Sequence, residues 1–428
     1  MRDEGPTTND QGPTSDGLRP SSSVLRLVMV GPFGLRPKGT MAARALPLAQ
    51  ALARRGHQVT LVLPPWSWPE DSGRVWEDEG VRILNVVLPR APAPLFHLQT
   101  TRRLLEATLA QRPDVVHCFK PKAYSGFVQA ALWARRWRGR LVLDEDDWEG
   151  WGGWNDLEPY PWLAKQVFAW QEAWGLRHAD VVTAASRALE TLALAHGIPR
   201  ERVVYLPNGA PPDAPAGDRA RGRARWCLPP DAPVVLLYTR FFEYKVSRLL
   251  AVFKAVHAAR PATRFLVVGN GLYGEEKELL AEWGRLSSQP TPQDALVYAG
   301  WTGDEALPDI FAASDVALYP LDDTLVNRAK SPAKLLQLLG AGVPVVADAV
   351  GQAAVYVGGA EVGGGVLVRP EMPTAMAEAV VALLDDAERR AALASRARVW
   401  VQQHYSWPQL AARLEQVYLG QTPTDALP

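Results

Sequence analysis

Cysteine is scarce in this sequence, and it has neither an excess of one charge nor a long apolar run. The two cysteines, Cys118 and Cys227, are too few for a disulfide framework or a zinc-ligand set, which fits a reducing compartment. Lysine plus arginine and aspartate plus glutamate both number 46, so the formal net charge is zero and a nucleic-acid binder is disfavoured. No stretch approaches the roughly twenty apolar residues that span a membrane.

Residues 1–23 are rich in glycine, proline, serine, threonine and aspartate and contain no apolar core. This composition predicts a disordered tail and not a signal peptide, which would need a continuous apolar segment. With few cysteines and no candidate membrane span, the sequence predicts a soluble, cytoplasmic protein.

A length of 428 residues favours two to three domains. The first half has a strand at Val24–Val30, a glycine-rich loop, a helix from about Thr40 to Arg55 and a strand at Gln58–Leu63. This order forms a βαβ unit and predicts an α/β fold, with a parallel sheet covered by helices on both faces. Further strands are predicted at Val81–Val87, Val115–Phe119, Leu141–Leu143, Val181–Ala184 and Val203–Leu206.

A second series of strands follows a segment rich in proline, alanine, glycine and arginine. We predict a first domain over residues 24–210, a linker over 211–232 and a second domain over 233–400. Two such sheets predict two lobes with a cleft, in which ligands bind beyond the carboxyl ends of the strands. The strands predicted in the second domain are Val234–Tyr238, Arg264–Val268, Ala295–Ala299, Val316–Tyr319, Val343–Ala347 and Gly365–Val368.

The stretch Asn327–Asp348, NRAKSPAKLLQLLGAGVPVVAD, combines a helix start with several cations. Ser331 is predicted to cap the helix with its side chain, and the fixed φ of the proline after it suits the first helical position. The free N–H groups and the dipole of a helix start favour an anion. Arg328, Lys330 and Lys334 surround this start, which suits a diphosphate. Ordinary solvated lysines on a surface helix are the alternative.

Three phrases carry a resemblance to a known family: the stretch just quoted, GPFGLRPKGTMAARALPLAQALARRGHQVTLVLP from Gly31, and ADVVTAASRALETLALAHGIPRERVVYLPNG from Ala179. They resemble the family 4 glycosyltransferases, retaining enzymes with the GT-B fold. The resemblance covers roughly residues 24–420. It implies two Rossmann-like domains that face each other across a cleft. It also implies a last helix, at residues 401–420, that crosses back onto the first domain and leaves 421–428 as a tail.

The resemblance also implies a donor site in the second domain. The run from Thr239 to Lys245 resembles a family phrase whose arginine and lysine clamp the donor diphosphate, where charge builds up as the glycosidic bond breaks. Arginine offers a two-pronged contact and lysine a compact charge, so Arg240 and Lys245 are the predicted catalytic residues. The other implied donor-site residues are Gly269, Gly271, Gly300, Trp301, Lys330, Ser331, Pro332, Ala333, Lys334 and Gln337.

The run Gly269–Gly274 matches the dinucleotide pattern G-x-G-x-x-G, which gives a competing interpretation. However, it follows the second strand of its domain, and no acid for a ribose follows the next strand, which ends at Gly300-Trp301. A dehydrogenase is therefore a weaker hypothesis. In the family, the corresponding glycine phrase lines the donor cleft, and the loop that Gly300-Trp301 matches lies near the nucleobase.

The acceptor side is predicted at the strand ends of the first domain. Gly31, Gly34 and Gly39 would let the backbone approach a substrate, or they form a plain tight turn. Related enzymes often carry a cleft histidine two residues after the position that His117 matches, where this chain has a phenylalanine. His117 is therefore predicted to be held within the sheet, while Lys120 is predicted to face the cleft.

Asp144–Glu149, DEDDWE, follows a strand and crowds several carboxylates together. Crowded carboxylates raise one another's pKa, so Glu145 and Asp146 are candidates for hydrogen bonding to sugar hydroxyls. A solvated acidic loop that pairs with arginines is the alternative. The run imitates the metal-binding DxD motif, but the resemblance implies a site without metal and without any cofactor beyond the donor.

Eight of the 16 tryptophans lie between Trp133 and Trp174. We predict core packing for most of them, with Trp151–Trp154 as a loop that lines the acceptor site. Stacking on sugar rings and a subunit contact are the alternatives. The basic run Arg135–Arg140 suits contact with an anionic membrane surface, although arginines at a helix C-terminus need no such role.

Taken together, the sequence predicts a retaining, metal-independent transfer of a hexose-type sugar from a nucleotide donor to a hydroxyl acceptor. The alternative is a non-catalytic module that only binds a sugar nucleotide. Three departures from the family pattern favour this alternative. Phe119 replaces the cleft histidine, Ala329 replaces the first glutamate of the E-x7-E pattern, and Gln337 replaces the glutamate at the ribose.

Overall fold

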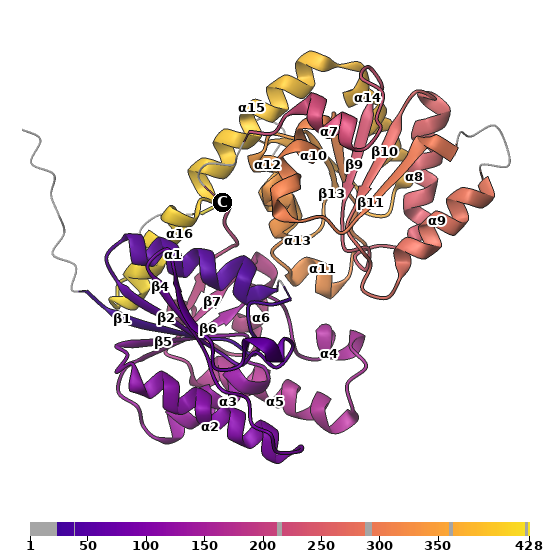
Figure 1. The fold of residues 1–428 in the computed structure, drawn as a ribbon. Helices are drawn as coiled ribbons and strands as arrows, with labels where there is room; N and C mark the ends of the chain where they lie inside the picture. Colours follow the sequence, from indigo (N-terminus) through magenta and orange to yellow (C-terminus); the bar gives the residue numbers. More distant parts are fainter. Residues whose placement is uncertain (1–23, 38, 212–215, 287–292, 359–362, 424–426) are drawn as a thin grey trace, which may run out of the picture.

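The computed structural model describes residues 24–37, 39–211, 216–286, 293–358, 363–423 and 427–428. These residues form two α/β domains, each built on a mainly parallel sheet with helices on both faces (Figure 1). The tail predicted at residues 1–23 lies outside the described residues.

The first domain contains an eight-stranded sheet in the order β3-β4-β2-β1-β5-β6-β7-β8. Its central strands are nearly continuous buried runs of valine and leucine, as expected for a sheet covered on both faces. The strands are β1 (Arg26–Val30), β2 (Gln58–Leu63), β3 (Val75–Asp78), β4 (Val81–Asn85), β5 (Val115–Phe119), β6 (Arg140–Glu145), β7 (Val181–Ala184) and β8 (Val203–Tyr205). Only β3, an antiparallel edge strand, was not predicted from the sequence.

The helices of the first domain connect these parallel strands. The helix that follows the glycine-rich loop begins with a π-helical turn, η1 (Met41–Ala45), and continues as α1 (Leu46–Arg54). The others are α2 (Leu95–Ala110), α3 (Ala123–Ala134), α4 (Trp154–Leu157), α5 (Trp162–His178) and α6 (Arg187–Ala195), with 3-10 turns at Pro69–Asp71 and Arg200–Arg202.

The second domain contains a six-stranded, fully parallel sheet in the order β11-β10-β9-β12-β13-β14. Its strands are β9 (Val234–Tyr238), β10 (Arg264–Val268), β11 (Leu296–Gly300), β12 (Val316–Tyr319), β13 (Val345–Asp348) and β14 (Gly365–Val368). Its helices are α8 (Val246–Ala259), α9 (Glu275–Leu286), α10 (Leu307–Ala313), α11 (Leu325–Ala329), α12 (Ala333–Gly340), α13 (Gly351–Val357) and α14 (Pro373–Asp385), with 3-10 turns at Gln293–Ala295 and Asp304–Ala306. The predicted two-lobe α/β architecture is therefore present.

The predicted linker contains a helix, α7 (Arg219–Arg225), that belongs to the second domain. Arg221 pairs with Asp309 of α10, and a Cβ atom on Gly222 would lie 2.2 Å from the backbone carbonyl of Asp309. Arg223 is buried and donates to the carbonyls of Pro229 and Ala232. Arginine contacts therefore hold this helix in place. Its sequence lacks the apolar periodicity from which a helix would be predicted.

The last two helices connect the second domain back to the first. Helix α15 (Ala387–His404) packs on α12, and α16 (Trp407–Tyr418) lies beside α1 (Figure 1). Trp407, Leu410, Leu414 and Tyr418 are part of the first domain's core, so the predicted crossover helix is present. Among the described residues, no helix is long and apolar enough to cross a membrane.

Candidate active site

The loop after β9 presents Arg240 at the carboxyl edge of the second sheet. The N–H of Thr239 donates to Val268 at 3.0 Å, and Phe241 has a φ of 67° with its N–H on the Thr239 hydroxyl at 2.8 Å. This turn leaves Arg240 exposed, with its guanidinium 5.3 Å from the Phe242 ring centroid. Arg240 forms no ion pair with another described residue, so its charge is open to a ligand.

The segments predicted for the donor site meet around Thr239. The Lys334 ammonium, from the first turn of α12, donates to the Thr239 carbonyl at 3.1 Å and lies 3.8 Å from the Tyr238 ring centroid. Gly269, at the end of β10, has a φ of 116°, and a Cβ atom there would lie 2.0 Å from the same carbonyl. Glycine is therefore required at this position by conformation and by space.

Ser331 does not cap α12 as the sequence predicted, because the N-cap is Pro332 and no side chain caps the helix. Ser331 instead hydrogen bonds to Tyr356 and accepts from the backbone N–H of Asn208, at 3.0 Å, at the end of the first domain. The first N–H groups of α12, from Ala333 onward, therefore have no side-chain cap, as an anion site requires.

The three cations predicted around this helix start have different surroundings. Arg328 is exposed and pairs with Asp323, so its charge is already matched by a carboxylate. Lys330 donates to Glu243 at 2.7 Å, and its ammonium lies 4.9 Å from the Phe242 ring centroid. Of the three, Lys330 and Lys334 thus lie next to the Arg240 loop.

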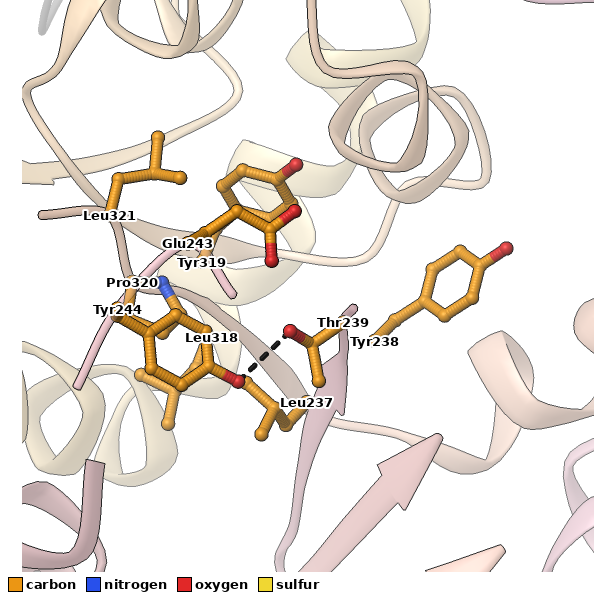
Figure 2. Close-up of a pocket in the computed structure, with 9 residues that line it drawn as sticks. All are labelled: Leu237, Tyr238, Thr239, Glu243, Tyr244, Leu318, Tyr319, Pro320 and Leu321. Carbon is orange, nitrogen blue, oxygen red and sulfur yellow. Dashed lines mark hydrogen bonds between the residues drawn. The ribbon is translucent and has the colours of Figure 1, made fainter. Parts of the chain in front are cut away.

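Glu243 is a buried carboxylate that the sequence did not single out. Burial opposes its ionisation, but Lys330, Arg240 and Lys334 together lower the pKa of Glu243. One of its carboxylate oxygens has no hydrogen-bond partner among the described residues. It lines a pocket at the ends of β9 and β12, in which Tyr244 donates to the Thr239 hydroxyl at 2.9 Å (Figure 2).

The remaining donor-site candidates lie on neighbouring segments of the second domain. The N–H of Gly271 donates to Glu276 at 2.9 Å, and Gly300, with a φ of 65°, accepts from the N–H of Gly269 at 2.7 Å. Trp301 is 74% exposed, so its indole is available for stacking on a base. Gln337 lies half-buried on the second turn of α12, and Lys245 is the exposed N-cap residue of α8.

The glycine-rich loop of the first domain is closely packed. A Cβ atom on Gly31 would lie 2.4 Å from Met41 Sδ, and one on Gly34 would lie 3.2 Å from Pro65. The carbonyl of Gly39 accepts from Ala42 and Ala43, which starts the π-helical turn. The tight-turn interpretation accounts for Gly31 and Gly39, and approach to a substrate stays a prediction.

The acidic run at the end of β6 is mostly buried, so it is not a solvated loop, although Asp144 pairs with an arginine as that alternative expected. Arg44 of η1 donates to both oxygens of Asp144 at 2.7 Å, and neither side chain is exposed by more than 1%. Asp146 accepts from the hydroxyl of Thr40 at 2.6 Å. The run therefore holds the glycine-rich loop against the end of β6.

Lys120 does not face the cleft as predicted, because it is buried among carboxylates. Its ammonium lies 3.1 Å from Asp146, 2.8 Å from Asp147 and 2.9 Å from Glu149. Burial works against its charge, but these carboxylates raise the pKa of Lys120 well above its usual value. Burial raises the pKa of Asp146 to about 6, whereas Lys120 lowers that of Asp147 against the effect of burial.

Glu145 is not placed to bond a sugar hydroxyl, because it is 1% exposed and lies against Glu172 of α5. Burial and the neighbouring carboxyl raise the pKa of Glu145 well above its ordinary value. Burial raises the pKa of Glu172 to about 8. These two groups form a buried carboxyl pair between β6 and α5.

His117 is held within the sheet, as predicted. Its Nδ1 lies 2.7 Å from the Tyr418 hydroxyl of α16, and its Nε2 lies 3.3 Å from the Thr183 hydroxyl. Burial lowers the pKa of His117 to about 4, so the ring is neutral at pH 7. Phe119 is also buried, and its ring centroid lies 4.6 Å from that of His117.

The loop of Trp151–Trp154 contacts the second domain. The ring centroid of Trp154 lies 5.1 Å from that of Phe242, and a Cβ atom on Gly152 would lie 3.1 Å from Leu325. Lys330 is also near enough to favour the charged form of Asp147. The Arg240 loop and the acidic run therefore face each other across the domain boundary.

Two family models match the two domains. The model of a glycosyl transferase 4-like domain matches residues 39–209, and the model of glycosyl transferases group 1 matches residues 232–386. Together the two matches span most of the chain. The chain belongs to the family 4 glycosyltransferases.

Curated relatives of this glycosyltransferase have related names. It is 26% identical to a GDP-mannose-dependent alpha-(1-6)-phosphatidylinositol monomannoside mannosyltransferase of Mycolicibacterium smegmatis, over 86% of this chain and 91% of the relative. It is 29% identical to a D-inositol 3-phosphate glycosyltransferase of Xylanimonas cellulosilytica, over 57% of this chain and 58% of the relative. These similarities support an enzyme and not a module that only binds.

Solved structures establish the fold of this glycosyltransferase. Sucrose-phosphate synthase from Thermosynechococcus elongatus superposes with a TM-score of 0.71 at 21% identity, over 92% of this chain and 98% of that chain. Anabaena HepE in complex with UDP superposes with a TM-score of 0.67 at 17% identity, over 92% of this chain and all of that chain. The fold is GT-B, as the resemblance implied.

Most of the glycosyltransferase's clustered tryptophans are not in its core, so that prediction is wrong. Of the eight between Trp133 and Trp174, only Trp148 is buried. Trp148 donates from its indole to the Trp151 carbonyl at 2.8 Å, which fixes the loop at the domain boundary. The exposed members are Trp133, Trp151, Trp162 and Trp170.

The enzyme's site also contains residues that the sequence analysis missed, chiefly Arg44, Glu172 and Glu243. Arg44 had a detectable signal, since it is a charge next to Ala45 and one turn before Leu48 on a buried helix face. Glu243 stands inside the Arg240–Lys245 phrase, where a lone acid between two cations is a second signal. Nothing in the sequence around Glu172 shows that it lies against Glu145.

Proposed function

We propose that this glycosyltransferase transfers a hexose-type sugar from a nucleoside diphosphate to a hydroxyl acceptor, with retention of configuration and without a metal ion. The observation that carries the proposal is the meeting of three segments around Thr239. The Arg240 loop, Gly269 and the first turn of α12 with Lys334 all adjoin this one residue.

In this proposal the diphosphate lies at the start of α12. Its charge grows as the glycosidic bond breaks, and preorganised donors that face this charge stabilise the transition state. Arg240 and Lys245 supply cations, and the N–H groups of Ala333 and Lys334 supply helix-start donors. The departing phosphate takes the proton of the acceptor hydroxyl, as the family resemblance implies. Gln337 would hydrogen bond the ribose as a neutral group.

The proposal that no metal ion is needed is supported by cationic side chains at the positions where a metal ion would bind. Lys120 occupies the centre of the acidic run, where it pairs with Asp146 and Asp147. Lysine and arginine also stand at the proposed diphosphate site, where they supply the charge that a metal ion would supply elsewhere. We therefore propose no cofactor beyond the donor. Both cysteines are free, which supports a cytoplasmic location.

The curated relatives narrow the choice of substrates to test. One relative is named for GDP-mannose and for a phosphatidylinositol monomannoside, and another for D-inositol 3-phosphate. A structural neighbour is bound to UDP. Guanosine and uridine diphosphate sugars are therefore the first donors to test, with inositol phosphates and inositol lipids as the first acceptors.

The test is incubation of the full chain with UDP-, GDP- and ADP-sugars, with and without these acceptors. We expect release of a nucleoside diphosphate from one donor class and a product whose anomeric configuration, determined by NMR, matches the donor. Activity should persist with EDTA. A product of inverted configuration would contradict the proposed retention. Loss of activity with EDTA would contradict the proposed independence of a metal ion. Binding of donors without release or transfer would contradict the proposal as a whole.

A further inference from the structure

A strip of aromatic rings runs along the outer side of the first domain. Helices α3 and α5 pack side by side (Figure 1). On α5, Trp170, Trp174 and His178 follow one another at four-residue spacing, with ring centroids 5.7 Å and 4.1 Å apart. Trp133 of α3 completes the strip, 5.6 Å from Trp174 and 5.0 Å from His178. The rings thus form one continuous surface across two helices.

This surface is open to solvent. Trp162 is 71% exposed, Leu163 68%, Trp133 53% and Trp170 48%. We call Trp133, Trp162, Leu163, Trp170 and Trp174 the tryptophan face. Indole side chains are costly to leave in water, and a continuous apolar patch of this kind marks a site of protein or membrane interaction.

Positive charges predominate on the two helices that carry the tryptophan face. Helix α3 has no acidic residue, and the only one on α5, Glu172, is buried behind the face. Arg135, Arg136 and Arg138 are exposed at the end of α3. The residues that line a groove there include Trp133, Arg136, Trp137, His178 and Asp180. The carboxylate of Asp180 accepts a hydrogen bond from the backbone N–H of Leu141 at 2.7 Å.

The tryptophan face also leads to the proposed active site. Helix α5 has 17 residues, which is about 25 Å of helix. It starts at Trp162, close behind the Trp151–Trp154 loop, whose last residue contacts Phe242 of the second domain. It ends at His178, beside the arginines of α3. A flat surface that lay along α5 would therefore reach from the arginines of α3 to the start of α5, next to the Trp151–Trp154 loop.

We propose that the tryptophan face docks the enzyme on an anionic membrane surface. Tryptophan prefers the membrane–water interface, where the indole ring lies among the headgroups and its N–H stays hydrated. Arginines beside it are attracted to anionic lipid, and no spanning helix is needed. A second copy of this chain fits less well, because α3 and α5 expose no acidic residue that could pair with the arginines of the other copy. The docking is a property of this surface and does not depend on the proposed chemistry.

The test is flotation of the full chain with phosphatidylcholine vesicles that contain or lack phosphatidylglycerol. We expect binding only with phosphatidylglycerol and a decrease with added salt. The variant R135Q/R136Q/R138Q should lower the partition coefficient roughly a hundredfold, because each arginine near an anionic surface adds about a factor of five. W133S/W170S should reduce binding through the loss of the apolar contact.

The matched control is R225Q/R389Q/R396Q, which removes three exposed arginines of the second domain and of α15 and should bind as the parent does. Unchanged thermal unfolding shows that each variant is folded. If W133S/W170S does not fold, the comparison of R135Q/R136Q/R138Q with the control variant decides whether the proposal holds. The proposal is overturned if vesicles do not bind, if both vesicle types bind equally, or if the control weakens binding as much. It is also overturned if sedimentation shows a dimer that W133S/W170S dissociates.

Discussion

The backbone N–H of Asn208 donates to the Oγ of Ser331 at 3.0 Å and so joins the last loop of the first domain to the donor helix of the second. The Asn208 amide also donates to the Ser331 carbonyl at 2.6 Å, and it accepts from Arg44 at 3.1 Å. This chain of bonds connects η1, the turn that follows the glycine-rich loop of the first domain, to the residue two positions before α12. A change in domain orientation must either carry these bonds along or break them.

Removal of the Arg240 guanidinium tests the proposed diphosphate clamp. Because Arg240 is exposed and forms no ion pair with another described residue, Arg240→Ala should leave the fold intact. We expect kcat to fall about 100-fold, as for the loss of one preorganised donor to a developing anion. Arg240→Lys should restore part of the rate, and Arg389→Ala on the outer side of α15 is the matched control. An unchanged kcat in Arg240→Ala would show that the clamp is assigned wrongly.

Gly269 should tolerate no side chain, whereas Gly284 of the same domain should tolerate one. Gly269 has a φ of 116°, and a Cβ atom would lie 2.0 Å from the Thr239 carbonyl. Gly269→Ala should therefore cost more than about 2 kcal/mol of unfolding free energy and displace the Arg240 loop. The matched change is Gly284→Ala, on α9, where a Cβ atom meets nothing within 4 Å. It should stabilise by about 0.5–1 kcal/mol.

Chemical denaturation and nucleotide binding check these two variants. If Gly269→Ala unfolds at the same denaturant concentration as the parent and binds nucleotide equally well, the close packing at Thr239 is not needed for the site.

The two sheets could be predicted from the sequence because their strands are short buried runs of valine and leucine between turn residues. For example, Gln58–Leu63 and Val234–Tyr238 have the predicted limits. Gly269 and Lys334 both lie against Thr239, because the carboxyl ends of parallel strands share one edge. A helix such as α7 could not be predicted, because Arg223 forms its stabilising bonds to carbonyls of the following loop.

The surroundings of the acidic run and of the tryptophans could not be predicted for another reason. Trp170 and Trp174 lie four residues apart on α5, and this spacing gives the same signal whether the helix face packs inward or faces solvent. The direction is decided by the sheet behind the helix, where Gln171 and Glu172 are among the buried residues. Lys120 likewise has the sequence pattern of a strand-end cation, and only the chain after β6 brings three carboxylates to it.

The buried pair of Arg44 and Asp144 should be strongly coupled. Neither side chain is exposed by more than 1%, so removal of one partner leaves a buried charge. Arg44→Ala or Asp144→Ala should each cost about 3–5 kcal/mol, and the double variant less than the sum of the two. Chemical denaturation of all four proteins gives the coupling energy. The same cycle on the exposed pair of Arg26 and Asp114 should give little coupling. Additive losses at Arg44 and Asp144 would contradict a mutual pairing.

The carboxyl pair of Glu145 and Glu172 should make stability decrease as pH rises. Burial raises the pKa of Glu172 from 4.5 to about 8, and that of Glu145 is also raised. Between these values the folded state keeps a proton that the unfolded state releases, so the stabilisation is complete at low pH and is lost as pH rises through the folded pKa. Glu149 and Lys120 also act on Glu172, in opposite directions.

Glu172→Gln should therefore match the parent near about pH 5 and exceed its stability near about pH 9, by on the order of a few kcal/mol. The measurement is thermal unfolding across this range. Glu388→Gln, at an exposed position on α15, is the control and should follow the parent's pH profile. A Glu172→Gln profile that stays parallel to the parent's would mean that this carboxyl does not hold a proton in the folded enzyme. In that case the charge of Lys120 would outweigh the burial of the pair.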